Sequence, residues 1–592
     1  MRFLSANHKP RVTLDHCTRV TRLFVVVLAF CAIVCNIQAQ KPVPQLPKIV
    51  LNTSWNPPAG GKTWAAHTAT DLKNALAASQ PGDVIVLDAG ATYNPAAAGI
   101  GYFSLPAKSN PNNQWIYIMS SGLANLPAGT RVDPTMTRYM AKIVTPNVSP
   151  ALKVMAGANH YRLAGLELTA QSNYPNGCGV SGQPHCMTYF LMSTDFPIAT
   201  EPDSITIDRC YLHGGPTQDL QGAIQANWSK TALIDSDVRD VHIKGYDSQA
   251  IGAWHSPGPF KIMNNYLEAA GENVMFGGAG GNSNSWVPSD IEIRNNYIFK
   301  RLSWVSASLS GAMVVKNAFE LKSAQRVLFD GNVIENVWAA AQMGYAIVLT
   351  VRTSQSGDLA VVNDVTITNN VLKNVVAGFN TEAEDDTCGA GGGYPNCKNP
   401  GSQDRWNISN NVFQFYDPKI QGGNRNLALS INGGINRLNN NKPGTLRDVV
   451  FQHNTTVSAA STPCWNSIYF GSNGQNYPFP VPLTNNVWIL DNALCDQPTG
   501  DYGLTGTSGL GYYMGNPTMS PNDLAHRFYG NVMWVQPGVK PASYSSSNMT
   551  TATPFTYVNP SVFDYQLLTP HWTTTSDGKL SGIDNNNLPA GY

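Results

Sequence analysis

Apolar and polar residues alternate in short runs along most of the chain, and Asn or Gly separates the runs. The stretch from Lys316 to Trp338, KNAFELKSAQRVLFDGNVIENVW, holds FELK, RVLFDG and VIENVW in succession. Period-two alternation of β-branched and aromatic residues predicts strands, and Gly or Asn between the runs predicts tight turns. We therefore expect short strands joined by corners.

A phrase with Asn in front of an apolar run recurs along the chain, for example NNYL at 264–267 and NNVLKNV at 369–375. The second residue of each phrase is 31 to 43 residues from the next: Asn265, Asn296, Asn332, Asn370, Asn411, Asn454, Asn492 and Asn531. Such a stretched period predicts a solenoid whose coils bury inward residues against their neighbours and carry insertions. Asn at each corner could hydrogen-bond from coil to coil, and Asn tolerates left-handed backbone.

In these repeats the sequence resembles the right-handed parallel β-helix superfamily, the pectate-lyase-like proteins. The resemblance covers most of the chain and implies an all-β, right-handed solenoid. Leu72–Tyr93, with helix character up to Ser79 and then a Pro-Gly turn, resembles the N-terminal helical cap and first coil of bacterial β-helix proteins. We expect a cap and first coils over 41–150, the β-helix over 151–540 and a closing segment over 541–592.

Residues 1–40 read as a secretory signal peptide. Basic residues precede the apolar run Leu23–Cys35, and small or polar residues follow it. The run is too short for a comfortable membrane span, and a lipoprotein signal fits less well because Phe30 and Val34 are bulky. The mature chain is expected to begin near Gln40, without a membrane span, as a secreted protein of the periplasm or the extracellular space.

Composition agrees with a turn-rich extracellular β protein. Charged residues make up 13% of the chain, with 52 Gly and 39 Pro. The formal net charge is zero, so nothing draws the protein as a whole to nucleic acid or an anionic membrane. An acidic polymer would need a local basic patch, and we expect a monomer.

Seven cysteines remain once Cys17, Cys31 and Cys35 leave with the leader. Three pairs are plausible loop disulfides in an oxidising compartment, namely Cys178 with Cys186, Cys388 with Cys397, and Cys464 with Cys495. Cys210 is left over, and because it takes the Asn position in IDRCYL we interpret it as a buried free thiol.

Charged residues cluster on one predicted strand of several successive coils. Alternation in FELK points Phe319 and Leu321 inward, so Glu320 and Lys322 face outward. Strands of a parallel sheet lie about 4.8 Å apart, which places Arg352 of LTVR beside Lys322 on one external face. Glu382 and Glu384 follow on the next coil, and Trp254, His255 and Glu272 are expected upstream on that face.

Such a cluster suits β-elimination of a uronate-containing polysaccharide. The reaction needs a base for the proton α to the carboxyl group and a positive charge that neutralises the carboxylate. A Lys beside an Arg has a lowered pKa through like-charge repulsion. We predict Lys322 as base and Arg352 as carboxylate clamp, with Glu320, Trp254, His255 and Glu272 in binding. Oxygen ligands suit Ca²⁺, and we predict these for a site at Glu382, Glu384 and Asp385.

Three alternatives remain open. The charges could form structural salt bridges, Glu320 with Lys322 and Arg352 with Glu384. A glycoside hydrolase could use Glu320 with Glu382 or Glu384, although the NTD, GDD, GHG and RIK phrases of polygalacturonase-like hydrolases are missing, as is the Arg-rich signature of the commonest pectate lyases. A non-catalytic, adhesin-like solenoid could bind glycans, with Trp254 either stacking on sugar or buried under a loop.

Overall fold

The computed structural model describes residues 41–589, apart from gaps. The longer gaps are 172–188, 279–286, 353–359, 383–401, 416–426, 472–483, 501–509, 515–523 and 536–543. The chain divides into two compact units, Met1–Lys41 and Pro42–Tyr592, and the fold below is that of the second.

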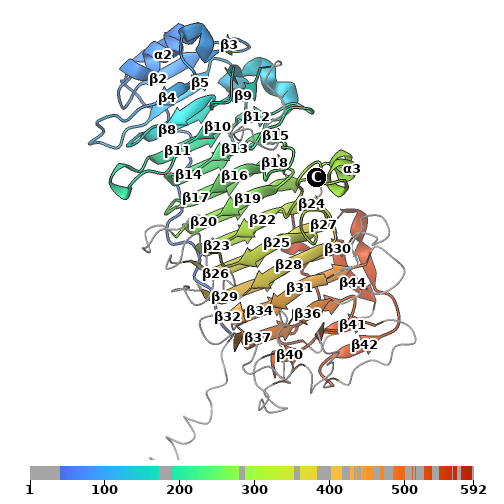
Figure 1. Cartoon of the computed structure of the whole chain (residues 1–592). Coiled ribbons are helices and arrows are strands. Elements are labelled where there is room, and N and C mark those ends of the chain that lie inside the picture. Colours follow the sequence, from blue (N-terminus) through green and yellow to red (C-terminus); the bar gives the residue numbers. More distant parts are fainter. Residues whose placement is uncertain are drawn as a thin grey trace, which may run out of the picture. The chain divides into compact units, whose positions relative to one another are not determined.

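Three long parallel sheets make up the molecule, and each coil of chain adds one strand to each of them (Figure 1). Sheet A contains β1 (Thr63–Ala66), β2 (Val84–Leu87), β5 (Ile116–Ser120), β8 (Asn159–Ala164), β11 (Asp203–Asp208), β14 (Ser229–Ile234), β17 (Phe260–Met263), β20 (Ser289–Arg294), β23 (Ala324–Asp330), β26 (Val361–Thr368), β29 (Ser402–Ser409), β34 (Leu446–Gln452), β37 (Thr484–Leu490) and β40 (Phe528–Tyr529). Sheet B contains β3 (Thr92–Tyr93), β6 (Ala141–Thr145), β9 (Leu166–Ala170), β12 (Tyr211–His213), β15 (Asp237–Val241), β18 (Tyr266–Ala269), β21 (Tyr297–Phe299), β24 (Val333–Val337), β27 (Val371–Val375), β30 (Val412–Phe415), β35 (Thr455–Val457), β38 (Ala493–Leu494), β41 (Val532–Trp534) and β42 (Met549–Thr551).

Sheet C carries the charged residues singled out above. It contains β4 (Phe103–Leu105), β7 (Leu152–Val154), β10 (Tyr189–Met192), β13 (Gly222–Gln225), β16 (Gln249–Ala253), β19 (Glu272–Phe276), β22 (Phe319–Leu321), β25 (Tyr345–Thr350), β28 (Ala377–Glu382), β31 (Leu427–Asn432), β36 (Ile468–Gly471) and β39 (Thr499–Gly500). Two short antiparallel pairs lie outside the three sheets, β32 (Ile435–Asn436) with β33 (Lys442–Pro443) and β43 (Thr556–Asn559) with β44 (Asp564–Thr569). The arrangement confirms the predicted right-handed parallel β-helix.

The core is a stack of inward side chains in register from coil to coil. In sheet C, Val274, Phe319, Ile347 and Phe379 are consecutive partners, and all four are fully buried. Across the core, the rings of Phe319 and Phe329 stack with centroids 4.7 Å apart. The inward positions that alternation predicts on FELK are therefore correct.

The recurring Asn residues form a buried ladder along the corner between sheets A and B. At each step one Asn donates its main-chain and side-chain N–H groups to the next, as in Asn296 to Asn332 Oδ1 at 3.0 and 2.9 Å, and Asn332 to Asn370 Oδ1 at 2.8 and 3.1 Å. The residue before the ladder Asn is often left-handed, with φ of 56° at Asn295 and 59° at Asn369. The predicted coil-to-coil bonding is confirmed.

Cys210 continues the ladder towards the N-terminus. Its amide donates to Ser236 Oγ at 3.0 Å, and Ser236 in turn donates its amide to Asn265 Oδ1 at 2.8 Å. The thiol is free and buried, and burial raises its pKa to about 12. This agrees with the predicted inert, structural cysteine.

The helix predicted before the Pro-Gly turn is α2 (Ala69–Ala78), which lies beside the first strands (Figure 1). Thr68 and Asp71 form a capping box at its start. A second short helix, α3 (Val305–Leu309), lies in the connection between β21 and β22. Ahead of β1 the chain crosses the strands of sheet A, since Lys48 N donates to Asp290 Oδ1 at 2.8 Å and Tyr117 donates its hydroxyl to Asn56 O at 2.8 Å.

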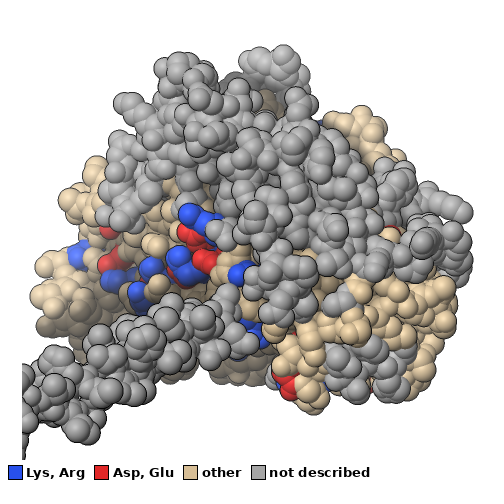
Figure 2. Space-filling view, turned by 90° about the horizontal axis from the view of Figure 1, so that it is seen from below, with Lys and Arg blue, Asp and Glu red and all other residues tan. Residues whose placement is uncertain are grey.

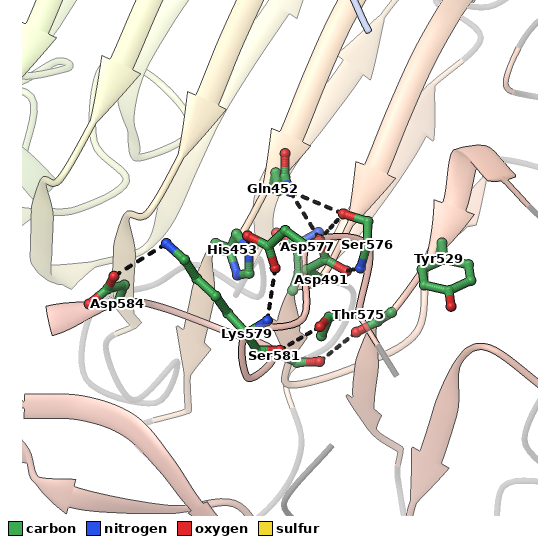
Figure 3. A network of polar contacts seen from close by, with 12 residues as sticks. Gln452, His453, Asp491, Tyr529, Thr575, Ser576, Asp577, Lys579, Ser581 and Asp584 are labelled. Atoms are coloured by element: carbon green, nitrogen blue, oxygen red, sulfur yellow. Dashed lines mark hydrogen bonds and ion pairs between the residues drawn. The ribbon is translucent and has the colours of Figure 1, made fainter. Parts of the chain in front are cut away.

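The C-terminal segment returns to the Asn corner and bonds to it (Figure 3). His453 lies 3.0 Å from Asp577 Oδ2 through Nε2 and 3.0 Å from Gly582 O through Nδ1. The buried Asp491 accepts the amide of Ser576 at 2.8 Å. The closing segment is thus attached through polar contacts at one end of the solenoid.

Asp577→Asn should loosen this attachment while leaving the solenoid folded. Burial alone would raise the pKa of Asp577, but bonding by Lys579 N and the nearby His453 lower it overall. The stabilisation is therefore present above the ordinary carboxyl pKa and lost at more acidic pH. We expect faster amide exchange confined to 575–588 and a local cost of about 1 kcal/mol after solvent screening. Unchanged exchange there would contradict the attachment.

Candidate functional site

The external face of sheet C at β19, β22 and β25 brings together the residues predicted for catalysis. Met275, Glu320 and Val348 are consecutive partners in register. Phe319, Leu321, Leu349 and Val351 are buried beneath this face, as alternation predicts. The amide of Arg352 donates to Lys322 O at 2.9 Å, so these two residues are neighbours on adjacent coils.

Lys322 and Arg352 each face a carboxylate of this surface. Lys322 Nζ lies 3.8 Å from Glu320 Oε1 and 3.4 Å from Met275 Sδ, and its side chain is about a quarter exposed. Arg352 Nη2 lies 2.6 Å from Glu382 Oε2. The Glu320–Lys322 pair is the one expected of a salt-bridge ladder, whereas the described partner of Arg352 is Glu382; Glu384 lies outside the described residues.

Three residues that the sequence analysis did not select complete the cluster. Lys316, just before β22, lies with its Nζ 2.5 Å from Asp247 Oδ2 and 3.3 Å from Glu272 Oε1. Gln249 Nε2 donates to the other oxygen of Glu272 at 2.7 Å. Lys316 and Asp247 precede their strands, where alternation gives no direction for a side chain. The only feature of the sequence that could have indicated these two residues is that each is a charged residue close to a strand, FELK or QAIGA, in a chain with few charges.

Burial and neighbouring charge push the carboxyl groups of this cluster in opposite directions. Burial, together with repulsion by Glu272, raises the pKa of Glu320 to about 7 despite the nearby Lys322. Burial alone would raise the pKa of Glu272 too, but Lys316 and Lys322 lower it overall. Burial also opposes the charge on Lys316, yet Glu272 and Asp247 raise its pKa. Glu272 and Lys316 therefore remain an ion pair while Glu320 can hold a proton.

Glu320→Gln should alter how stability depends on pH. The pKa of this carboxyl is higher in the folded chain than its ordinary 4.5, so the folded state binds the proton more tightly. The unfolding free energy of the native protein then falls as pH rises from about 4.5 to about 7. Relative to Glu320→Gln we expect a loss on the order of 2 kcal/mol between pH 5 and pH 8, measured by denaturant titration. Parallel profiles would contradict the raised pKa.

A buried lysine holds the turn that positions Glu272. Lys300 is fully buried, and its Nζ donates to the carbonyl oxygens of Ala269, Ala270 and Gly271 and to Asn273 Oδ1, at 2.5 to 3.0 Å. Burial lowers the pKa of Lys300 to about 7. These contacts hold the residues on both sides of Glu272 in place. The position of the Glu272 carboxylate is therefore well defined.

Trp254 and His255 lie at the end of β16, upstream of Lys322 on the same sheet. Both are half-buried, and Asn227 Oδ1 accepts their amides at 3.1 and 3.3 Å. The Trp254 ring folds back over Gly252, where an added Cβ would come within 2.9 Å of it, and meets Tyr189 edge-on at 6.2 Å. Gly252 pairs with Met275, so this aromatic pair is close to the charged cluster.

The residues predicted to bind Ca²⁺ are only partly described. Glu384 and Asp385 lie outside the described residues, and the Glu382 carboxylate is engaged by Arg352. Elsewhere, ligand atoms of His453, Asp491 and Asp577 lie within 4.8 Å of one another, so this group could hold a metal ion. On the face shown in Figure 2, basic and acidic side chains gather in one mixed group.

Of the three predicted disulfides, Cys464–Cys495 is present, with the two Cα atoms 5.2 Å apart. Cys178, Cys186, Cys388 and Cys397 lie outside the described residues. Among the helices that the structure describes, none has the length and apolarity needed to cross a bilayer.

Comparison with known proteins gives structural likenesses only. No family model matches the chain, and no curated protein matches it. A PL6 family alginate lyase, AlyGC, has a TM-score of 0.46 and 12% identity over 90% of this chain and 58% of that one. A mannuronic acid specific family 6 lyase from human gut microbiota has a TM-score of 0.39 and 10% identity over 83% and 91%.

A third similar structure is pectate lyase Pel9A, with a TM-score of 0.34 and 13% identity over 69% of this chain and 78% of that one. The chain thus spans 58% of the length of the first of these lyases.

Proposed function

We propose that this protein is a secreted polysaccharide lyase that cleaves a uronate-containing glycan by β-elimination. The supporting observation is that Lys322 and Arg352 lie on adjacent coils of sheet C, joined by a main-chain hydrogen bond from the Arg352 amide to Lys322 O at 2.9 Å. A base and a cationic group side by side are what removal of a proton α to a carboxylate requires. The Trp254–Tyr189 aromatic pair lies beside the cluster.

In the proposed reaction, the unprotonated amine of Lys322 takes the proton at C5, which is α to the uronate carboxyl group. The electron pair of that C–H bond forms the C4–C5 double bond, and the C4–O bond breaks. The leaving oxygen takes up a proton from water, so the products are an unsaturated uronate end and a new hydroxyl end. Arg352 stabilises the negative charge that builds up on the carboxylate in the transition state.

Glu320 is well placed to return the proton to solvent. Its carboxyl oxygen lies 3.8 Å from Lys322 Nζ, and its pKa of about 7 allows it to gain and lose a proton near neutrality. Below that pH we expect the rate to fall, because Glu320 then stays protonated and cannot accept a proton from Lys322. His255 is proposed to contact a sugar hydroxyl group, whereas the fully buried Glu272 carboxylate is held by Lys316 and Gln249.

The deciding experiment follows ultraviolet absorbance of the unsaturated uronate product. The purified mature protein is incubated with alginate, pectate, a glucuronan and a chondroitin, each with and without Ca²⁺. Absorbance that rises with one polymer supports elimination and names the uronate. New reducing ends without absorbance would contradict it.

That second outcome would favour a glycoside hydrolase, and one observation supports this alternative. Glu320 and Glu272 belong to one cluster, yet the pKa is raised for Glu320 and lowered for Glu272. A protonated and an ionised carboxyl are the acid and base that hydrolysis uses. In that case Glu320→Gln should abolish release of reducing ends, and Lys322→Ala should leave it measurable.

A further inference from the structure

The charged cluster of sheet C has a lysine where a metal ion would be expected. Carboxylates from three successive coils point to one place: Asp247 before β16, Glu272 on β19 and Glu320 on β22. Lys316 Nζ lies 2.5 Å from Asp247 and 3.3 Å from Glu272, and Glu320 adds to the field on it. A group of oxygens from neighbouring strands is the kind of site that Ca²⁺ binds.

The space for such an ion is already taken. The Lys316 ammonium contacts both Asp247 Oδ2 and Glu272 Oε1, so it lies where an ion bound to both carboxylates would lie. The side chain of Glu272 is fully buried, and Gln249 Nε2 occupies its second oxygen. The Lys316 ammonium offsets the charge of Asp247 and Glu272, which weakens the attraction for a divalent ion.

We propose that the Lys316 ammonium takes the place of a divalent cation at this site, so that the chain supplies the cation itself. The inference rests on the elimination proposed above, for which it means that no added metal ion is needed. Lys316 is a positioning residue: it keeps Glu272 ionised and holds Glu272 and Asp247 in place. With its side chain one-fifth exposed, it also adds positive charge next to Lys322, where a uronate carboxylate would bind.

Measuring metal binding tests whether Lys316 takes the place of a cation, and it needs no enzymatic activity. Terbium luminescence is titrated on the protein, with Asp577→Asn present throughout so that the His453 group is disabled. The unaltered cluster should bind no terbium. Lys316→Ala opens the site and removes one positive charge, so we expect terbium affinity to rise at least about tenfold. Lys316→Met removes the charge but fills the space, so its terbium affinity should rise less than that of Lys316→Ala.

Two further variants show where any terbium binds. Adding Glu272→Gln to Lys316→Ala should abolish the gained binding. Lys373→Ala removes a lysine that pairs with Glu335 at 3.1 Å on sheet B, and should gain none. Circular dichroism and thermal unfolding establish that each variant is folded, and Lys316→Gln replaces Lys316→Ala if the latter does not fold.

Two results would overturn the inference. One is terbium binding to the cluster with Lys316 intact, lost on Glu272→Gln, since a metal ion would then displace the ammonium. The other is a folded Lys316→Ala that binds no terbium. Activity is measured separately: lyase rates should change less than about twofold on EDTA treatment. If no polymer is cleaved at all, the proposed function fails, while the terbium result still decides whether Lys316 fills a cation site.

Discussion

Lys322→Ala should lower the rate of unsaturated-product formation by at least about a hundredfold, because it removes the proposed base. The effect should be on the turnover rate more than on KM, since the amine acts in the transition state and contributes little to holding a long polymer. The measurement is the ultraviolet assay with the polymer that the native protein cleaves. Lys322→Arg should not restore the rate, because the guanidinium stays protonated.

The matched control is Lys373→Ala, which removes a lysine of similar exposure that also pairs with a glutamate. It should leave the rate within about twofold, because the pair lies on sheet B, away from the site. Arg352→Ala should be impaired to a similar degree as Lys322→Ala, because charge builds up on the carboxylate in the same step. A Lys322→Ala variant with native folding and undiminished rate would rule out Lys322 as the base.

Much of the fold could be predicted because every coil of the β-helix is stabilised by the same interactions. Each coil needs an inward apolar stripe and an Asn whose side chain bonds to the next coil, and both leave a visible period in the sequence. Alternation then gives the direction of Phe319 and Leu321, and hence of Lys322. The long insertions carry no such period, so the predictions placed on Glu384, Asp385, Cys388 and Cys397 stay predictions.

The candidate site could be predicted only where its residues lie inside strands. Glu320, Lys322 and Arg352 follow from alternation and the spacing of neighbouring strands. Lys316 and Asp247 lie 69 residues apart, and each precedes its strand, where the chain turns. Their contact depends on the length of every insertion between them and on the turn that Lys300 holds. The pKa of Glu320 likewise depends on burial by neighbouring coils, which spacing along the chain does not express.

Asn332→Ala should lower the unfolding free energy by about 3 kcal/mol, because it removes a middle rung of the buried ladder. Asn332 Oδ1 accepts the main-chain and side-chain N–H groups of Asn296, and Asn332 Nδ2 donates to Asn370 Oδ1 and to Ile293 O. Without the side chain these groups are left buried and unpaired, which costs more than the bonds contribute. Denaturant unfolding of the mature chain measures the loss.

Asn125→Ala provides the control, since Asn125 is exposed and its side chain makes a 3.3 Å bond to Gly122 O. The unfolding free energy of Asn125→Ala should stay within about 0.5 kcal/mol of the native value. Asn332→Asp is more informative still, because an ionised carboxylate can accept both bonds from Asn296 but cannot donate to Asn370 Oδ1 or Ile293 O. It should therefore destabilise strongly at neutral pH and less in acid, where the protonated group can donate again. Equal losses of unfolding free energy at both pH values would show that the packing of the side chain at position 332, and not its hydrogen bonds, stabilises the corner.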